Sequence, residues 1–302
     1  MAQTERVAPL VVALVLDWLC GEPPARLHPV VWMGRLLDWL EARAPRSATP
    51  RLVYGACVAL VLPLGWALFA GAVERCVPWP LRGLILKPAF AGRALLESAD
   101  DVESALVHGD VALARSKLRA LVSRPTAHLE GALLAAAACE SLAENMVDSW
   151  LAPLLAYSLF GLSGAYAYRA ANTADAMWGY RTRRYELLGK ASARLDDLLN
   201  YLPARLGAIV MCCAAGPRWH AAVEVWRRDS GSTSSPNAGQ SMACAAGALG
   251  VRLEKKGHYV LNAAAQLPDA ESIARARGLV ARAMWLSAAL VVLPLSSLVR
   301  RG

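Results

Sequence analysis

Three acidic residues, Glu140, Glu144 and Asp148, recur at every fourth position within the segment ESLAENMVDSW. On an α-helix this spacing places the three carboxylates within an arc of about 80°, on one face. Uncharged segments, GALLAAAAC and SWLAPLLAYSLFGLSGAYAY, lie on either side. Because ionisable side chains in membrane segments are costly, they mark functional sites by default. The stripe therefore predicts a functional site, with a solvated helix face at the membrane surface as the alternative.

The densest polar segment, residues 172–205, offers ligands for a metal ion and for phosphate. Asn172 and Asp175 are one helical turn apart, and Asp196 and Asn200 share a helix face. Carboxylate and amide oxygens suit Mg²⁺, which prefers oxygen ligands and phosphate partners. A solvated loop with local ion pairs is the alternative. Arginines that could bind phosphate through two hydrogen bonds are Arg181, Arg183 and Arg184, while Arg194 shares a face with Asp197 and Tyr201.

Three shorter motifs carry weaker signals. The segment LLGKAS, residues 187–192, is not a Walker phosphate-binding loop, because position 184 is arginine where that motif needs glycine. The segment SSPNAGQ, residues 234–240, predicts a turn before a helix of small residues. Such a helix N-terminus could take an anion, although a plain helix entry is the alternative. His28 lies in the proline-rich segment GEPPARLHPV, where a structural role is the alternative to a catalytic one.

The composition is that of an integral membrane protein with substantial polar loops. Of the 302 residues 56% are hydrophobic and only 19% are charged, and the mean hydropathy is +0.33. The 10 Trp and 8 Tyr against 3 Phe favour a membrane–water boundary. The net charge of +8 could reflect binding to nucleic acid, but no soluble basic domain is visible. We therefore interpret the basic residues as flanking membrane segments and binding anionic substrates. The seven cysteines contain no C-x-x-C pair, which argues against a zinc site or a disulfide framework.

Uncharged apolar runs predict the membrane segments. They cover residues 7–16, 52–73, 149–168, 206–217 and 283–299. A spanning helix needs roughly 20 residues, so about four or five crossings are expected, with the short runs as tilted, re-entrant or buried helices. The predicted fold is an all-α, polytopic membrane protein with amphipathic surface helices. It forms a single membrane-embedded domain, residues 1–302, with polar loops at about 20–51, 74–128, 169–205 and 218–282.

Four segments together resemble the adenosylcobinamide-phosphate synthase family of cobalamin biosynthesis proteins. They are HPVVWMG (28–34), ESLAENMVD (140–148), NTADAMWGYRTRRYELLGKASARLDDLLNYLPAR (172–205) and SPNAG (235–239), and they follow one another in the family's order. The sequence departs from the family pattern around SPNAG, in the preceding RRDSGSTS and the following Gln240-Ser241. The resemblance implies a multi-pass protein of the cell (inner) membrane. It also implies an ATP- and Mg²⁺-dependent amide ligation, in which adenosylcobyric acid is joined to aminopropanol or its phosphate through an acyl phosphate.

The resemblance also implies roles for the polar residues. Carboxylates would form two walls of a cage for the metal and phosphate. Glu140, Glu144 and Asp148 would be one wall and Asp175, Asp196 and Asp197 the other, with Asp148 and Asp196 as metal ligands and the remaining four as catalytic groups. Substrate or phosphate would be held by His28, Asn145, Asn172, Tyr180, Arg181, Arg184, Lys190, Arg194, Asn200, Arg205 and Asn237.

Two other classes of function remain alternatives. One is a membrane transporter with the acidic stripe lining a solute path, although no internal repeat typical of transporters is present. The other is a non-catalytic accessory or signalling membrane protein of the same superfamily. Expected partners of the ligase are the corrinoid substrate, the amine substrate, the lipid bilayer and other membrane enzymes of late cobalamin synthesis, with no nucleic acid.

Overall fold

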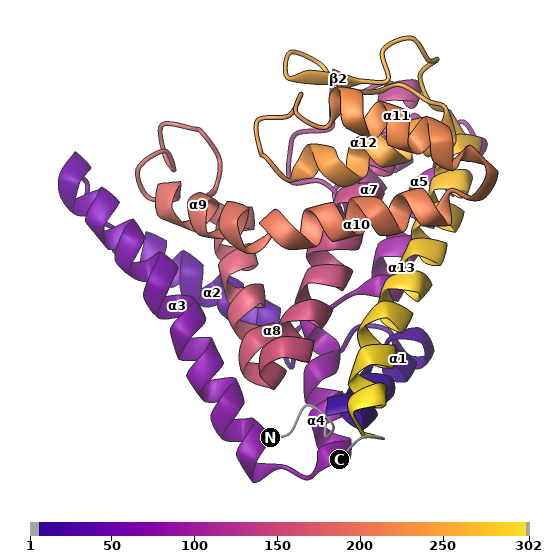
Figure 1. Ribbon diagram of the computed structural model, residues 1–302. Helices are drawn as coiled ribbons and strands as arrows, with labels where there is room; N and C mark the ends of the chain where they lie inside the picture. Colours follow the sequence, from indigo (N-terminus) through magenta and orange to yellow (C-terminus); the bar gives the residue numbers. More distant parts are fainter. Residues whose placement is uncertain (1–5, 300–302) are drawn as a thin grey trace. The chain divides into compact units, whose positions relative to one another are not determined.

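The computed structural model describes residues 6–299, most of which are helical (Figure 1). The chain divides into two compact units, each assembled from segments that are distant in the sequence. The first unit comprises the described residues up to Ala91, together with Ala152–Asn200 and those from Leu290 onward. The second comprises Gly92–Leu151 and Tyr201–Ala289. The predicted single domain stays a prediction, and its residues 1–5 and 300–302 lie outside the described residues.

The first unit is built on two long helices, α3 and α8, that pack along each other (Figure 1). Shorter helices cover them: α1 packs on α4, and α2 and α9 pack on α8. The bounds are α1 (Val7–Cys20), α2 (Pro29–Glu41), α3 (Ala48–Cys76), α4 (Trp79–Leu86), the 3₁₀ turn η2 (Lys87–Ala89), α8 (Ala152–Trp178) and α9 (Lys190–Leu199).

Helix α8 is interrupted at Gly161, and a buried glutamate of α3 fills the break. Gly161 has φ +68°, a left-handed conformation that favours glycine. The break frees the N–H of Leu162, which donates to Oε2 of Glu74 at 3.3 Å. The run at 149–168, predicted to span the membrane, is therefore not a straight helix. Counting uncharged residues could not reveal this, because the residue that stabilises the break lies 88 positions earlier in the chain.

The second unit packs short helices around α7 and the π turn that follows it. Contacts join α5 to α6 and α7, and α12 to α7, α10 and α11. The bounds are α5 (Gly92–Val107), α6 (Val111–Leu118), α7 (Gly131–Met146), the π turn η3 (Val147–Leu151), α10 (Tyr201–Ala214), the 3₁₀ turn η4 (Gly216–Arg218), α11 (Trp219–Asp229), α12 (Ala238–Leu249) and most of α13 (Ala270–Val299).

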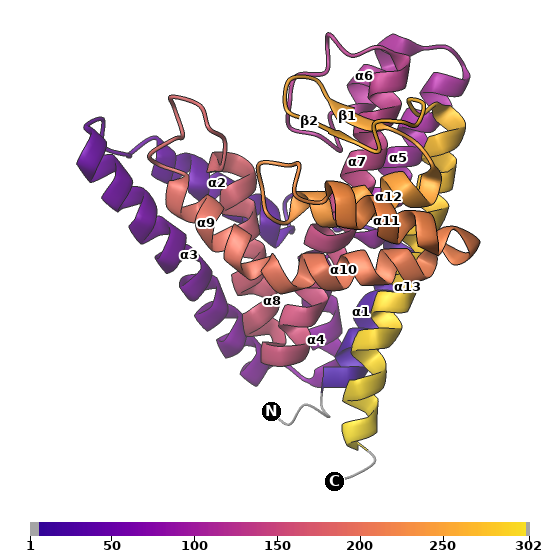
Figure 2. The same ribbon diagram turned by 45° about the horizontal axis from the view of Figure 1, so that its top comes forward.

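A two-stranded antiparallel hairpin corrects the all-α prediction. Strands β1 (Leu253–Lys255) and β2 (Tyr259–Leu261) pair with Leu253 opposite Leu261. Gly257, at φ +75°, makes the turn between them. Figure 2 shows the hairpin beside α7 and α12, and both contacts are present in the unit. Each strand has only three residues, too few for an alternating pattern to be visible in the sequence.

The membrane segments are fewer than predicted. By length and apolar composition, the part of the chain from 6 to 299 holds two helices able to span a membrane, Ala48–Cys76 and Ala270–Leu293. A third span is possible if the pair Tyr201–Ala214 and Gly216–Asp229, bent by 119°, is taken as one. The run at 52–73 thus lies in a candidate span, the run at 283–299 overlaps the other one as far as Leu293, and the run at 206–217 lies at the bend. The count of four or five is not confirmed.

The polar loops contain the helices that their patterning predicted. Helices α2, α5, α6, α9 and α11 all lie within these loops. Helices α5 and α6 are separated at Gly109, which has φ +74°, and Asp110 caps α6 by accepting the N–H of Leu113 at 2.8 Å. An aspartate at this position satisfies one of the free N–H groups of the first helical turn.

Candidate active site

The buried carboxylate of Glu140 is the centre of the polar cluster in the second unit. Glu140 lies on α7 and is only 4% exposed. Its Oε2 accepts a hydrogen bond from Nη2 of Arg124 at 2.9 Å, while its Oε1 is buried without a hydrogen-bond partner. Burial is the main reason that the pKa of Glu140 is raised to about 7, against the opposing charge of Arg124. A carboxyl that titrates near neutral pH can exchange a proton during a reaction.

Glu144 and Tyr259 belong to the same cluster. Glu144, one turn after Glu140 on α7, is half-buried, and its negative charge contributes to the raised pKa of Glu140. Tyr259, on β2, has a raised pKa because of burial and the charges of both glutamates. Its hydroxyl lies 3.7 Å from Sδ of Met242. The hairpin that sequence patterning missed therefore supplies a wall of this cluster.

The rest of the predicted acidic stripe follows a different geometry. Helix α7 ends at Met146 and the chain widens into a π turn over Val147–Leu151. The 100° spacing that aligned Asp148 with the two glutamates does not apply in a π turn, which is a feature often found at functional sites. The predicted Asn145 is held there, because its Nδ2 donates to the Ser141 carbonyl at 3.0 Å and its Oδ1 accepts from Ser149 at 3.0 Å.

Two further predicted residues of the second unit meet each other. Arg205, on α10, donates to Oδ1 of Asn237 at 3.3 Å and to the Tyr201 carbonyl at 2.7 Å. Its guanidinium also lies 3.5 Å from the centre of the Tyr201 ring. Asn237 is buried at the start of α12, where its N–H donates to Oγ of Ser235. Two residues 32 positions apart in the sequence are thus in contact, and their role in substrate binding stays a prediction.

The first unit holds a second polar cluster, centred on Asp196. Its Oδ1 accepts from Nδ2 of Asn172 at 3.2 Å and its Oδ2 from Nδ2 of Asn200 at 3.0 Å, so α8 and α9 are joined through one carboxylate. Tyr168 donates to Oδ1 of Asn200 at 2.8 Å. Burial is the largest cause of a raised pKa at Asp196, and the charge of Asp197 adds to it. The cluster contains three of the predicted residues.

Around this cluster the remaining predicted residues of the first unit lie at or near the surface. Arg194 pairs with Asp197 at 3.7 Å on the outer side of α9. Asp175 is half-buried near the end of α8, and its carbonyl accepts the N–H of Gly179 at 2.6 Å. Tyr180, Arg181, Arg184 and Lys190 are exposed in or next to the loop 179–189. Arg184 is already engaged, because its Nε donates to Oε1 of Glu41 at 2.6 Å.

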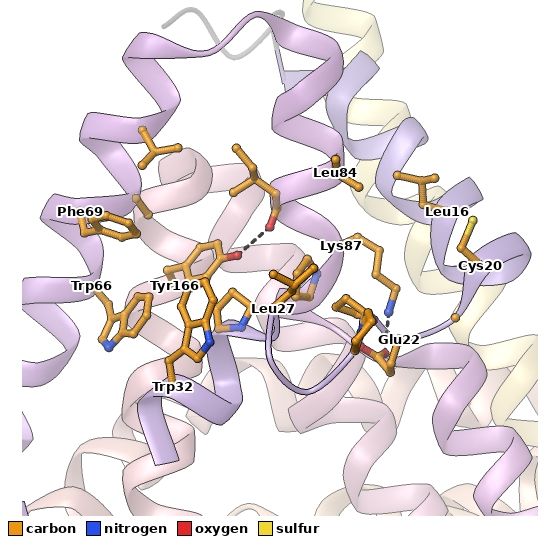
Figure 3. A pocket seen from close by; sticks show the side chains of 18 residues that line it. Leu16, Cys20, Glu22, Leu27, Trp32, Trp66, Phe69, Leu84, Lys87 and Tyr166 are labelled. Atoms are coloured by element: carbon orange, nitrogen blue, oxygen red, sulfur yellow. Dashed lines mark hydrogen bonds and ion pairs between the residues drawn. The ribbon is translucent and has the colours of Figure 1, made fainter. Parts of the chain in front are cut away.

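His28 caps α2 and joins a buried ionic cluster in the first unit. Its Nδ1 accepts the Val30 N–H at 3.2 Å, and its Nε2 lies 3.0 Å from Oε2 of Glu22. Lys87 lies 2.5 Å from the other oxygen of Glu22 (Figure 3) and 2.9 Å from Asp17. Burial acts to raise the pKa of Glu22, but the hydrogen bonds and charges of His28 and Lys87 outweigh it and lower that pKa.

A model of the CobD/Cbib protein family matches residues 10–287. The chain belongs to the CobD/Cbib family. It is 42% identical to the cobalamin biosynthesis protein CobD of Chromobacterium violaceum, over 93% of this chain and 94% of that protein. It is 40% identical to the probable cobalamin biosynthesis protein CobD of Methanothermobacter thermautotrophicus (84% and 86% covered) and 37% identical to the cobalamin biosynthesis protein CbiB of Salmonella typhi (82% of each). No solved structure matches the chain.

Membership of the CobD/Cbib family confirms the family resemblance, but it leaves the residue roles as predictions. The two predicted carboxylate walls belong to different units. Among the described residues, no group of three or more His, Cys, Asp or Glu side chains is arranged to hold a metal ion. Asp148 and Asp196 as metal ligands therefore stay predictions, as do the phosphate contacts of the arginines.

Six residues of these clusters were not predicted from the sequence. They are Asp17, Glu22 and Lys87 beside His28, Arg124 and Tyr259 beside Glu140, and Tyr168 beside Asn200. Asp17 had a usable signal, because it is a carboxylate inside an apolar helix and is fully buried. Lys87 is also almost fully buried, which is rare for lysine unless it is paired. Arg124 lies in a loop and Tyr259 in a three-residue strand, where local patterns carry no signal for a distant partner.

Proposed function

We propose that this CobD/Cbib protein is an adenosylcobinamide-phosphate synthase. It would catalyse an ATP- and Mg²⁺-dependent amide ligation that joins adenosylcobyric acid to aminopropanol or to its phosphate. Membership of the CobD/Cbib family supports a role in cobalamin biosynthesis. The observation that carries the reaction class is Glu140, a buried carboxyl with a pKa of about 7 that lies between Arg124 and the Tyr259 hydroxyl. Amide formation needs such a group, because an amine attacks only after its ammonium form has lost a proton.

Glu140 is proposed as the general base. Arg124 holds one carboxylate oxygen at 2.9 Å, which fixes the side chain and leaves Oε1 to accept the proton. The proton passes from the substrate ammonium to Oε1, and the free amine attacks the activated carboxyl carbon. The new C–N bond forms as the bond to the leaving phosphate breaks, and the second amine proton leaves with that phosphate. Burial, with a smaller contribution from the charge of Glu144, keeps the pKa of Glu140 high, so that Glu140 can accept a proton near neutral pH.

The Asp196 cluster fits a metal that arrives with a nucleotide. Mg²⁺ is usually held by one or two carboxylates together with substrate phosphates and water, so a preformed cage of three carboxylates is not required. Asp196, with the amides of Asn172 and Asn200, supplies oxygen and amide groups, and its raised pKa shows that burial disfavours its charge. Mg²⁺–ATP would activate the substrate carboxyl when bound. The exposed Arg181 and Lys190 could then contact phosphate.

The protein is proposed to be a multi-pass protein of the inner membrane. Helices α3 and α13 are its candidate spans. The corrinoid and the amine would reach the protein from water, and enzymes of late cobalamin synthesis in the same membrane would be its neighbours. Nucleic acid has no place in this proposal.

The decisive experiment is an assay of the protein purified in detergent. Adenosylcobyric acid, Mg²⁺–ATP and either aminopropanol or its phosphate are supplied, and the amide product is measured by mass spectrometry. The proposal predicts product with at least one of the two amines, and loss of product in Glu140→Gln. Glu254→Gln is the matched control, because it removes another arginine-paired glutamate of the second unit. Absence of product with both amines, from a folded protein, would reject the ligase in favour of a transporter or accessory role.

A further inference from the structure

Two buried cysteines of the second unit lie with their sulfur atoms side by side. Cys212, on α10, and Cys244, on α12, have their Sγ atoms 3.4 Å apart. All seven cysteines of the chain are free. The sulfurs of a disulfide are about 2.05 Å apart, so an approach of about 1.4 Å would bring these two thiols to bonding distance. The proposed ligase chemistry uses neither of them.

The two cysteines belong to a regular seam between α10 and α12. Arg205 of α10 donates to Asn237 of α12, and seven residues later on each helix Cys212 donates to Cys244. Seven residues are about two helical turns, so the two helices run side by side in the same direction and keep their register over that length. Between the two pairs, Cys244 donates to the Ala208 carbonyl of α10 at 3.5 Å. The packing of both helices therefore holds the sulfurs together.

The two thiols differ in their hydrogen bonds and in their access to solvent. Cys212 donates to the sulfur of Cys244, whereas Cys244 donates to the Ala208 carbonyl. Cys244 is fully buried, while Cys212 keeps 6% of its surface exposed. A small oxidant from solvent therefore meets Cys212 first. The sulfur of Cys244 already lies beside the atom that would be oxidised.

We propose that Cys212 and Cys244 form a reversible disulfide in the presence of peroxide, and that this bond locks α10 to α12. The sulfur of Cys212 loses its proton and attacks one oxygen of hydrogen peroxide; the O–O bond breaks, and the released hydroxide takes that proton and leaves as water. The sulfur of Cys244 then attacks the sulfenic acid on Cys212; the S–S bond forms, the S–O bond breaks, and a second water leaves with the Cys244 proton. Two thiols thus lose two electrons, and one peroxide is reduced to two waters.

A bond at this place would restrain the second unit beside its polar cluster. Helix α12 packs on α7, which carries Glu140, as well as on α10. The bond also closes the segment from Cys212 to Cys244 into a loop, which removes conformations from the unfolded chain. The oxidised protein is therefore the more stable form, and a thiol reductant returns it to the reduced form. This inference goes beyond the ligase reaction and does not depend on it.

The test compares the oxidised and the reduced protein. The full-length protein, purified in detergent, is treated with hydrogen peroxide and then with dithiothreitol. It is digested without reductant for mass spectrometry, and its unfolding is followed by tryptophan fluorescence. After peroxide we expect a pair of peptides joined through Cys212 and Cys244, and a rise of about 5 °C in the unfolding temperature. Dithiothreitol should reverse both changes, which separates them from methionine oxidation.

Cysteine variants separate this pair from the other thiols. Cys244→Ala should lose the joined peptides and the rise in unfolding temperature, and Cys212→Ala is a second variant in case the first does not fold. Cys139→Ala is the matched control, because Cys139 is also fully buried in the second unit but donates to the Ser272 carbonyl, and it should keep both effects. Cys213→Ser, which removes the exposed neighbour, should keep them too.

Four results would overturn the proposal. The wild type might give no joined peptides under conditions that oxidise its exposed cysteines, or the joined peptides might disappear in Cys213→Ser. The bond might join two copies of the chain, which a non-reducing gel would show as a dimer. The crosslinked protein might also unfold at the same temperature as the reduced protein, and the bond would then lock nothing.

Discussion

The pH dependence of stability is the most direct test of the buried state of Glu140. In the folded protein burial raises the pKa of this carboxyl from 4.5 to about 7. The folded state therefore keeps a proton that the unfolded chain releases above pH 4.5. The resulting stabilisation is fully present below pH 4.5 and is lost as pH rises to 7. A pKa change of this size corresponds to about 3 kcal/mol of unfolding free energy.

Replacement of Glu140 by Gln removes this titration. Relative to Glu140→Gln, the wild type should lose about 3 kcal/mol between pH 4.5 and pH 8, which corresponds to roughly 6–12 °C in unfolding temperature. The measurement is thermal unfolding of both proteins in detergent at half-unit pH steps, followed by tryptophan fluorescence. Glu254→Gln, the arginine-paired control, should run parallel to the wild type. Parallel curves for the wild type and Glu140→Gln would show that Glu140 is not buried in this way.

Three further predictions follow from the same contacts. Gly161→Ala should destabilise the protein by about 2 kcal/mol, because alanine disfavours φ +68° and its Cβ would lie 2.7 Å from the Glu74 carboxylate. The control Gly65→Ala, with open space around it, should not destabilise the protein, and equal melting curves for the two variants would contradict the prediction. Asp196→Asn should abolish ligase activity and leave the unfolding temperature at pH 7 unchanged or higher, whereas turnover within a few-fold of wild type would exclude Asp196 as a ligand. Arg124→Met removes the positive charge beside Glu140, so the rise of activity with pH should move to higher pH; an unmoved profile would exclude Glu140 as the titrating base.

Local spacing predicted those features that depend on neighbours in the sequence. The amphipathic helices of the polar loops and the pairing of Asp196 with Asn200 both involve residues within one or two turns of a helix. The candidate spans around 52–73 and 283–299 follow from apolar composition alone. The grouping of Asn172 with Asp196 needed more than spacing, because they lie 24 residues apart on different helices. The contact between them was not predicted; the sequence placed both only within the polar segment 172–205.

Features that depend on distant partners could not be predicted. The break in α8 requires Glu74, and the burial of Glu140 requires Arg124 from a loop 16 residues away. The π turn shifts Asp148 out of the regular helical spacing, and the residue types within that turn do not predict a π turn. The pairing of the fully buried Asp17 with Lys87 likewise joins residues 70 positions apart in the sequence.

The buried carboxylates differ in what compensates their charge, and this difference separates structure from chemistry. Asp17 is paired with the ammonium of Lys87. This ion pair accounts for the presence of that acid in apolar surroundings. Glu74 accepts the N–H freed by the break in α8, and its other oxygen is buried without a partner. Asp196 is held by amides that carry no charge, and Glu140 keeps a raised pKa in spite of Arg124. Folding alone does not favour a buried acid whose charge is incompletely compensated. A bound cation or a transferred proton would explain the presence of Asp196 and Glu140.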